Sequence, residues 1–319
     1  MSVSRASLLL AALVGAGCSA PVVDDVSDAS SGMTEGVVVV ERSSSADGPT
    51  QSNISAKFMH LGASADPDLA ERLVGLRLDL PAPGRCLSMP GADVAGVQSP
   101  GSLAALGPIE LLDVGDVTVH IKPVPGEPSQ PAMALAARAF PDVGDLVSGV
   151  FYTSRDAASD LPGGTTYVLE GSGNLDRWAG STGAGPVERF SIEAEAPPAP
   201  DDVRVGDAAL ADGAQLDEGA PVLVRWHAGD RAKSDQILVD LRSAGGDAVR
   251  CAFEDSGEAS VPASVLESKL LAGPGPLTLA FHRIRRRPLG APALTGIDAG
   301  EVRFDLSIVG RATIVRRAP

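Results

Sequence analysis

Residues 222–254, VLVRWHAGDRAKSDQILVDLRSAGGDAVRCAFE, contain three short runs in which apolar and polar residues alternate. Alternation with a period of two is typical of a β-strand that has one buried and one exposed face. Glycine and aspartate separate the runs, as they do in turns between strands. The pattern therefore predicts three strands, with Trp226 and Cys251 on their buried faces, where Phe281 from a later run joins them.

The same pattern continues toward the end of the chain. Alternating runs recur at 277–281 and 302–308, and residues 265–270, after Pro262, favour one short helical crossover. About seven short strands in a segment of this length are typical of an Ig-like β-sandwich. We therefore predict an Ig-like β-sandwich domain over residues 201–319, preceded by a proline-rich boundary at 195–202.

The preceding segment, 53–196, predicts a second β-rich domain. Asp66 followed by Pro67 has the form of an N-cap and a first helical residue, which predicts a short helix. Residues 187–192 and 302–306 each follow a glycine-containing turn, so we expect both to be closing edge strands. In 133–140 alanine favours helix but alternation favours strand, and we expect strand. The expected strands are 54–61, 77–80, 109–122, 133–140, 147–152, 165–170 and 187–193.

The first eighteen residues, MSVSRASLLLAALVGAGC, have the form of a targeting signal. Arg5 supplies a positive charge, and a short apolar run and small residues lead to Cys18. The stretch resembles a bacterial lipoprotein signal, which implies a signal peptide over 1–17 and lipidation of Cys18 with palmitate. Gly15 stands where that family usually has leucine, and the alternative is an ordinary secretory signal cleaved near Ala20. Because serine rather than aspartate follows Cys18, the resemblance favours the outer membrane over the inner one.

Residues 18–52 are rich in serine, aspartate and glycine, with six acidic residues against one base, Arg42. Such a composition does not offset the entropy of ordering a chain, so we expect a flexible acidic linker between the lipid anchor and the folded body. The run Val37 to Val40 is the exception. It is either a strand added to a sheet edge or an unpaired apolar patch. The expected fold class is thus all-β, with two β-sandwich (Ig-like) domains after a signal peptide and a disordered linker.

Several stretches together carry a family resemblance: LDVGDVTV (112–119), FPDVGDLVSGVFYTS (140–154), PVLVRWHAG (221–229), VRCAFEDSG (249–257) and SVPASVL (260–266). With the lipobox and the acidic linker, they resemble uncharacterised predicted lipoproteins of GC-rich Gram-negative bacteria. The resemblance covers most of the chain. It implies an Ig-like sandwich and a location in the cell envelope, and it brings no activity with it.

The net charge and the cysteine content limit the partners and bound groups that we expect for this chain. The net charge of −15 argues against nucleic acid as a partner, because the chain and the phosphate backbone repel each other. Export permits a disulfide between Cys86 and Cys251, and two separate buried thiols are the alternative. No paired-cysteine spacing or histidine cluster points to a metal, and we expect neither a metal nor a cofactor. Aspartates in the two DVGD stretches fit turn chemistry better than calcium binding.

No motif for catalysis is present: the sequence has no GxSxG, HExxH or P-loop pattern. The four histidines, His60, His120, His227 and His282, are dispersed along the chain. We therefore expect no catalytic residues and no enzymatic activity. The alternative is a hydrolase whose site assembles in space around His227 or His282, since sequence order does not constrain a triad.

The strongest local anomaly is a basic cluster near the C-terminus, Arg283, Arg285, Arg286 and Arg287. Converging guanidinium groups could bind phosphate or carboxylate groups, which would make this an anion-binding module. The alternative is that these arginines pair with the chain's own surplus of acids. The sequence as a whole predicts a lipid-anchored envelope protein without catalytic activity that binds a protein or glycan partner or acts structurally.

Overall fold

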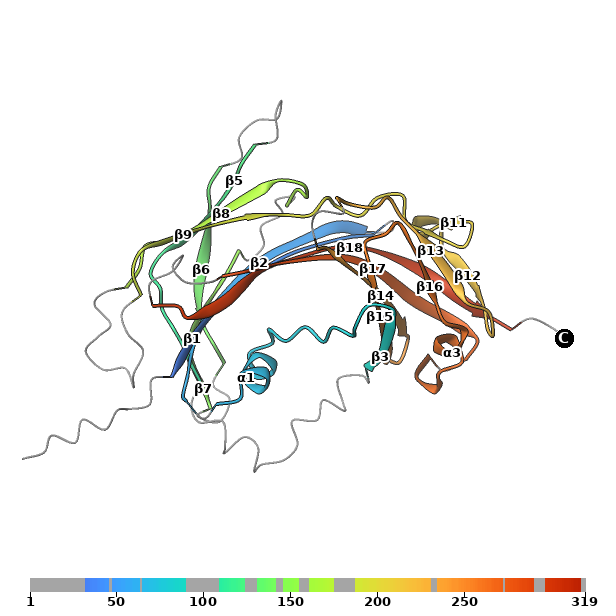
Figure 1. Cartoon of the computed structure of the whole chain (residues 1–319), viewed down its shortest axis with the longest axis horizontal. Helices are drawn as coiled ribbons and strands as arrows, with labels where there is room; N and C mark the ends of the chain where they lie inside the picture. The colour runs from blue at the N-terminus through green and yellow to red at the C-terminus, as the bar shows by residue number, and fades with distance from the viewer. Residues whose placement is uncertain are drawn as a thin grey trace, which may run out of the picture. The chain divides into compact units, whose positions relative to one another are not determined.

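The computed structural model describes residues 32–45, 48–63, 65–89, 109–123, 131–141, 146–154, 161–174, 187–230, 234–271, 273–289 and 296–316 (Figure 1). The expected signal peptide and Cys18 lie outside the described residues. The chain is all-β, as predicted, with short helices between strands. The helices among the described residues are α1 (Pro67–Leu73), α3 (Ala263–Leu266) and the 3-10 turns η3 (Leu210–Asp212) and η4 (Lys269–Leu271).

Most described strands join one continuous sheet in the order β3-β15-β14-β17-β18-β1-β2-β4-β7-β6-β5-β8-β9, with β12 pairing the end of β18. A second sheet has the order β11-β10-β13-β16. The bounds are β1 Met33–Ser45, β2 Gly48–Leu61, β3 Arg85–Met89, β4 Ile109–Leu111, β5 Val117–Ile121, β6 Met133–Ala139, β7 Val147–Thr153, β8 Thr166–Gly171, β9 Phe190–Glu195, β10 Arg204–Val205, β11 Ala208–Ala209, β12 Ala214–Asp217, β13 Val222–Arg225, β14 Gln236–Ser243, β15 Ala248–Glu254, β16 Glu258–Val261, β17 Gly275–Pro288 and β18 Ala299–Val315.

The predicted buried faces of the C-terminal strands meet in one core. Trp226, Cys251 and Phe281 all belong to the same buried cluster, and the rings of Trp226 and Phe281 lie 5.2 Å apart. This core lies between the small sheet, including β13 and β16, and strands β14, β15, β17 and β18 of the large sheet. Alternation alone therefore predicted which side chains pack together, because each strand has only one face toward this core.

A second core forms around the valines of β1. Val38 and Val40 pack with Ile54 and Phe58 of β2 and with residues of β5, β8 and β9. Tyr167 of β8 also packs on Phe304 of β18, with ring centres 5.3 Å apart. Two layers of the folded-over sheet thus enclose this core, in the manner of a sandwich.

The expectation of a flexible linker is wrong for residues 33–45 and 48–52, which lie in strands β1 and β2. Strand β1 pairs with β18 on one side and β2 on the other. Its opposite face is covered too, because Val37 and Val39 pack in a third cluster with Ala70 of α1 and Leu76. A strand covered on both faces reads as a continuous apolar run, which explains Val37 to Val40.

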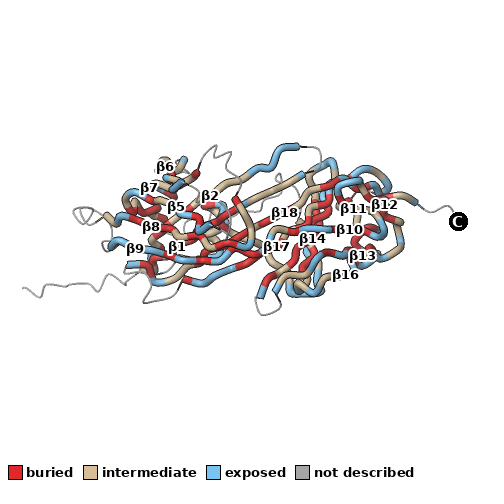
Figure 2. Tube along the Cα trace, turned by 90° about the horizontal axis from the view of Figure 1, so that it is seen from above, coloured by how far each residue is buried: buried red, intermediate tan, exposed pale blue. Residues whose placement is uncertain are grey.

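Strand β18 also departs from prediction, because it is central in the sheet and not a closing edge. By contrast, β9 is the last strand in the sheet order, as expected. Along its length β18 serves both cores: Phe304 packs in the first, and Ile314 in the second. Figure 2 shows buried residues recurring along β17 and β18. The predicted division into 53–196 and 201–319 therefore separates two cores that share long strands.

Two local predictions have opposite outcomes. The Asp66 side chain accepts hydrogen bonds from the Asp68 and Leu69 amides at the start of α1, which confirms the predicted cap. Residues 77–80, in contrast, are not a strand, because they lie over the face of the sheet rather than within its ladder. The strand predicted at 133–140 is present as β6.

Candidate functional site

The predicted arginine cluster does not converge on an open surface. Arg283 continues the face of β17 that carries Phe281, and only 1% of it is exposed. Its Nε lies 2.9 Å from Asp255 Oδ2, and its Nη1 and Nη2 groups donate to the carbonyls of Pro198 and His227. These contacts hold the proline-rich boundary segment, whose carbonyls have no strand partner, against the C-terminal core.

Arg285 has the same role two residues further along β17. It donates from Nε and Nη2 to both carboxylate oxygens of Asp235, at 2.6 and 2.8 Å, and the Asp235 side chain is fully buried. Its Nη1 donates to the carbonyls of Glu195 and Ala196 at 3.3 and 3.1 Å. Arg283 and Arg285 thus connect the boundary segment to the C-terminal strands inside the protein. This matches the alternative prediction, in which the arginines pair with the chain's own acids.

The remaining two arginines point elsewhere. Arg286 lies on the opposite face of β17, where its Nε is 2.5 Å from Glu301 Oε2 and half of the side chain is exposed. Arg287 is exposed near the end of the strand. The hypothesis of a combined anion site at Arg283, Arg285, Arg286 and Arg287 is therefore wrong, because alternation sends neighbouring side chains to opposite faces.

The histidines do not assemble a triad within the described part of the chain. His282 lies between two carboxylates, with Nδ1 2.8 Å from Asp305 and Nε2 3.8 Å from Asp240. Both ring nitrogens therefore face acids, and neither is placed to accept a proton from a hydroxyl. Burial alone would lower the pKa of His282, but Asp305 and Asp240 together raise it above its ordinary value of 6.5. His227 is mostly exposed beside Asp201.

Cys86 and Cys251 form a disulfide, as the sequence allowed. They are directly opposite each other in the antiparallel pair of β3 and β15. The bond attaches edge strand β3 to the large sheet. It also fixes the end of a segment that we call the strap, residues 74–84, which leads from α1 to β3.

The strap crosses one face of the large sheet. The Leu76 carbonyl accepts a hydrogen bond from Arg303 Nη1 of β18 at 2.7 Å, and Gly84 donates to Ala252 of β15 at 2.7 Å. Between these points Leu78 and Leu80 pack on a small apolar cluster that includes Ile284 of β17. Alternating leucines thus bind the strap to the sheet, while Arg77 and Asp79 between them pair with each other at 2.7 Å.

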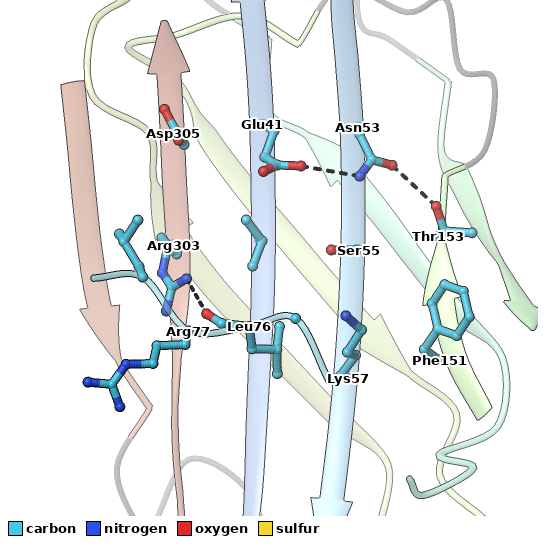
Figure 3. A pocket seen from close by; sticks show the side chains of 13 residues that line it. Glu41, Asn53, Ser55, Lys57, Leu76, Arg77, Phe151, Thr153, Arg303 and Asp305 are labelled. Carbon is cyan, nitrogen blue, oxygen red and sulfur yellow. Dashed lines mark hydrogen bonds between the residues drawn. The ribbon is translucent and has the colours of Figure 1, made fainter. Parts of the chain in front are cut away.

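A pocket of about 380 Å³, which we call the strap pocket, lies beside the strap on this face (Figure 3). This volume is within the range of about 300–1,000 Å³ that is usual for small-molecule sites. The lining comes from β1, β2, β7, β18 and the strap: Val39, Glu41, Asn53, Ser55, Lys57, Gly75, Leu76, Arg77, Leu78, Phe151, Thr153, Arg303 and Asp305. It is a concave site with polar groups from several elements of the described chain.

Lys57 is the cation of the pocket that lacks a carboxylate partner within 4 Å, judged over the described residues. Its Nζ donates to the Val74 carbonyl at 2.5 Å and lies 5.8 Å from the centre of the Phe151 ring. Burial lowers the pKa of Lys57, and the more distant Glu41 partly opposes this shift. One ammonium N–H is therefore used by the strap, and the Lys57 side chain itself lines the pocket (Figure 3).

A chain of polar side chains crosses the floor of the pocket. Thr153 Oγ1 donates to Asn53 Oδ1 at 3.2 Å, and Asn53 Nδ2 donates to Glu41 Oε2 at 3.4 Å (Figure 3). The three residues come from neighbouring strands β7, β2 and β1. Asn53 and Glu41 keep further donor or acceptor capacity after these bonds, so the row can recognise hydroxyl groups.

The other charged lining residues are already neutralised inside the protein. Arg303 donates from Nε and Nη2 to Glu301, and Asp305 accepts from His282. Arg77 pairs with Asp68 and Asp79. The net electrostatic character of the strap pocket therefore comes from Lys57 at one end and Glu41 at the other.

A further acidic group lies near the pocket where α1 meets β1. The pKa of Glu35 is raised to about 7, mainly by burial and also by Glu71 of α1, which shares a hydrogen bond with it, and by Glu301. Arg303 acts in the opposite direction. Helix α1, and with it the start of the strap, thus packs best on β1 when one carboxyl of this group carries a proton.

Sequence reasoning missed the strap pocket because its floor is formed by β1 and β2, part of which was expected to be linker. One signal was available: Asn53, Ser55 and Lys57 alternate with the buried residues Ile54 and Ala56. Such a strand is typical of a sheet with one polar face. Asp113, by comparison, accepts from Gly115 N and Tyr152 Oη, which is the predicted turn chemistry.

No family model and no curated protein matches this sequence. Among solved structures, the chain is similar to a segment of two fibronectin type III domains from chicken tenascin, with 12% identity, 85% of this chain and 95% of that chain covered, and a TM-score of 0.21. It is also similar to the FN1–FN3 domains of chicken CNTN1, with 14% identity, coverage of 81% and 77%, and a TM-score of 0.22. At these scores we base the proposed function on the residues of the site.

The described residues contain neither a membrane-spanning helix nor a cluster of metal-binding side chains. No helix there has the length and apolar character needed to cross a membrane. No group of three or more histidine, cysteine, aspartate or glutamate side chains in the described ranges is arranged to hold a metal ion.

Proposed function

We propose that this chain is a lipid-anchored protein of the cell envelope, placed at the outer membrane by Cys18, that binds a partner without catalysis through the strap pocket. The anchor is supported by the form of residues 1–18, with an apolar run, small residues and a cysteine. The binding role is supported by one observation above all. The strap pocket contains an ammonium group that has no carboxylate partner within 4 Å among the described residues, and a row of hydrogen-bonding side chains on a rigid sheet.

Binding explains this arrangement better than hydrolysis does. Lys57 and Asn53 can donate to a ligand, but neither they nor their neighbours in the described chain provide a hydroxyl activated by a histidine. His282, the best candidate base, is occupied by Asp305 and Asp240. The pocket therefore holds a ligand and leaves its bonds intact.

The anchor is tested by metabolic labelling. The full chain is produced in a Gram-negative host with an alkyne analogue of palmitate, alongside a Cys18→Ala variant. We expect label on the full chain and its recovery with outer membranes, and neither for the variant. A variant that still fractionates with membranes would refute anchoring at Cys18.

Binding is tested by photo-crosslinking in the native envelope. A photoreactive amino acid is placed at Thr153, inside the strap pocket, and in a second variant at Ser260, an exposed residue of β16. We expect a specific adduct from position 153 that position 260 does not give. Equal adducts at both positions, or none at position 153, would refute the pocket as the binding site, and turnover of the captured molecule would replace binding by catalysis.

A further inference from the structure

The charge of Lys57 identifies one end of the ligand. An ammonium group that is half-buried and held by a single carbonyl gains most from an anionic group that reaches it through the pocket. Glu41, the only opposing charge in the pocket left unneutralised by an ion pair among the described residues, lies too far away to take that place.

The distance between Lys57 and Glu41 limits the size and type of the ligand. Lys57 is opposite Val37 in the ladder, and Glu41 is opposite Asn53, so the backbone positions of the two charged residues are four residues apart along the strands. At about 3.3 Å per residue, this is roughly 13 Å. An inorganic anion or a free amino acid, with its charges on neighbouring atoms, cannot contact both ends.

The surface between the two ends is suited to hydroxyl groups. Ser55 and Asn53 offer both donors and acceptors, and a hydroxyl also donates and accepts. Phe151 adds an apolar wall beside Lys57, against which the C–H face of a sugar ring can pack. A peptide backbone has fewer groups to match this row, because its donors and acceptors alternate in a fixed order.

We propose that the strap pocket binds an acidic saccharide of about two rings, with a sugar carboxylate at Lys57 and ring hydroxyls along Ser55, Asn53, Thr153 and Glu41. This inference rests on the proposed binding function and specifies its ligand class. It makes Lys57 the residue that selects acidic over neutral sugars, and Phe151 and Thr153 the residues that hold the sugar whatever its charge.

The test uses calorimetry on the folded protein with three matched pairs of disaccharides. Each pair has a terminal glucuronate, galacturonate or mannuronate against the corresponding glucose, galactose or mannose, and an alanine tripeptide serves as the peptide probe. We expect at least one acidic disaccharide to bind about tenfold more tightly than its neutral partner, since one charged hydrogen bond contributes about this factor. Added salt should reduce the difference.

Variants assign the preference to its residue. Lys57→Gln should remove the tenfold preference, Lys57→Arg should keep it, and Lys122→Gln should change nothing, because Lys122 is an exposed lysine that pairs with Glu193. Phe151→Leu should weaken the acidic and neutral sugars alike. Lys57→Arg also shows whether any loss in Lys57→Gln comes from charge or from misfolding.

Three results would overturn the inference: equal binding of acidic and neutral sugars, a preference that Lys57→Gln leaves intact, or binding of the tripeptide in place of the sugars. If no saccharide binds but position 153 still gives its crosslink, the ligand class is wrong and the proposed binding function stands. If the crosslink is absent as well, both fail.

Discussion

Replacing Arg285 with methionine should destabilise the protein more than any other single change in the arginine cluster. The substitution leaves Asp235 with a fully buried, uncompensated carboxylate, and it removes a donor from the carbonyls of Glu195 and Ala196. Breaking a buried ion pair by removing one partner costs about 3–5 kcal/mol. At about 2–4 °C per kcal/mol for a chain of this size, the melting temperature should fall by roughly 6–20 °C.

The assay is urea unfolding followed by circular dichroism, with calorimetry for the melting temperature. Arg286→Met is the matched control, because Arg286 is half exposed and its pair with Glu301 is worth about 1 kcal/mol or less. The double variant Arg285→Met, Asp235→Leu should recover much of the loss, since it removes the buried charge together with its partner. A loss below about 1 kcal/mol for Arg285→Met, or one equal to that of the control, would refute the connector role of Arg285.

Three further changes test other features. His282→Gln should remove part of the pH dependence of the free energy of unfolding. Because the folded-state pKa of His282 is raised, the stabilisation from its charged form is complete below the unfolded pKa near 6.5 and is lost as the pH rises through the folded pKa. A variant whose stability profile between pH 6 and 9 matches that of the original protein would contradict this. Glu35→Gln should stabilise the protein at pH 8 but not at pH 4. The folded pKa of Glu35, about 7, exceeds the unfolded pKa, so the original protein loses stability as the pH rises from the unfolded to the folded value and the proton shared with Glu71 is lost. Equal effects of the substitution at both pH values, measured by urea unfolding, would argue against the shared proton. Joint replacement of Cys86 and Cys251 by alanine should cost about 2–4 kcal/mol and increase amide exchange in β3 first, whereas uniform exchange across the sheet would show that the bond does not hold that edge.

The C-terminal core could be predicted from the sequence because its information is local. The runs of β13, β15 and β17 alternate in sequence, so Trp226, Cys251 and Phe281 could be assigned to one core before their neighbours were known. The cap at Asp66 is equally local, since a side chain and the two following amides define it. The alternation of apolar and polar residues along a strand and the capping of a helix both depend on residues that are adjacent in the sequence.

The strap pocket and strand β1 could not be predicted in the same way. Composition predicted a linker over residues 18–52, but Val37 to Val40 become a strand through pairing with Glu301 and its neighbours in β18, more than 250 residues away. The partners of Arg283 and Arg285 are likewise remote or irregular segments. Contacts of this kind depend on which segments pair across the whole chain, and local patterns do not specify that choice.

The parallel pairing of β1 and β18 has a mechanical consequence. The two strands stay in register from Glu35 opposite Ala299 to Ser45 opposite Val309. A force that pulls the start of β1 away from the end of β18 acts along the strands in opposite directions. It therefore loads the evenly spaced hydrogen bonds of the ladder together, in shear, and does not unzip them one at a time. A protein held from its N-terminal side and pulled from its C-terminal side would resist that force at this ladder, with both cores still folded behind it.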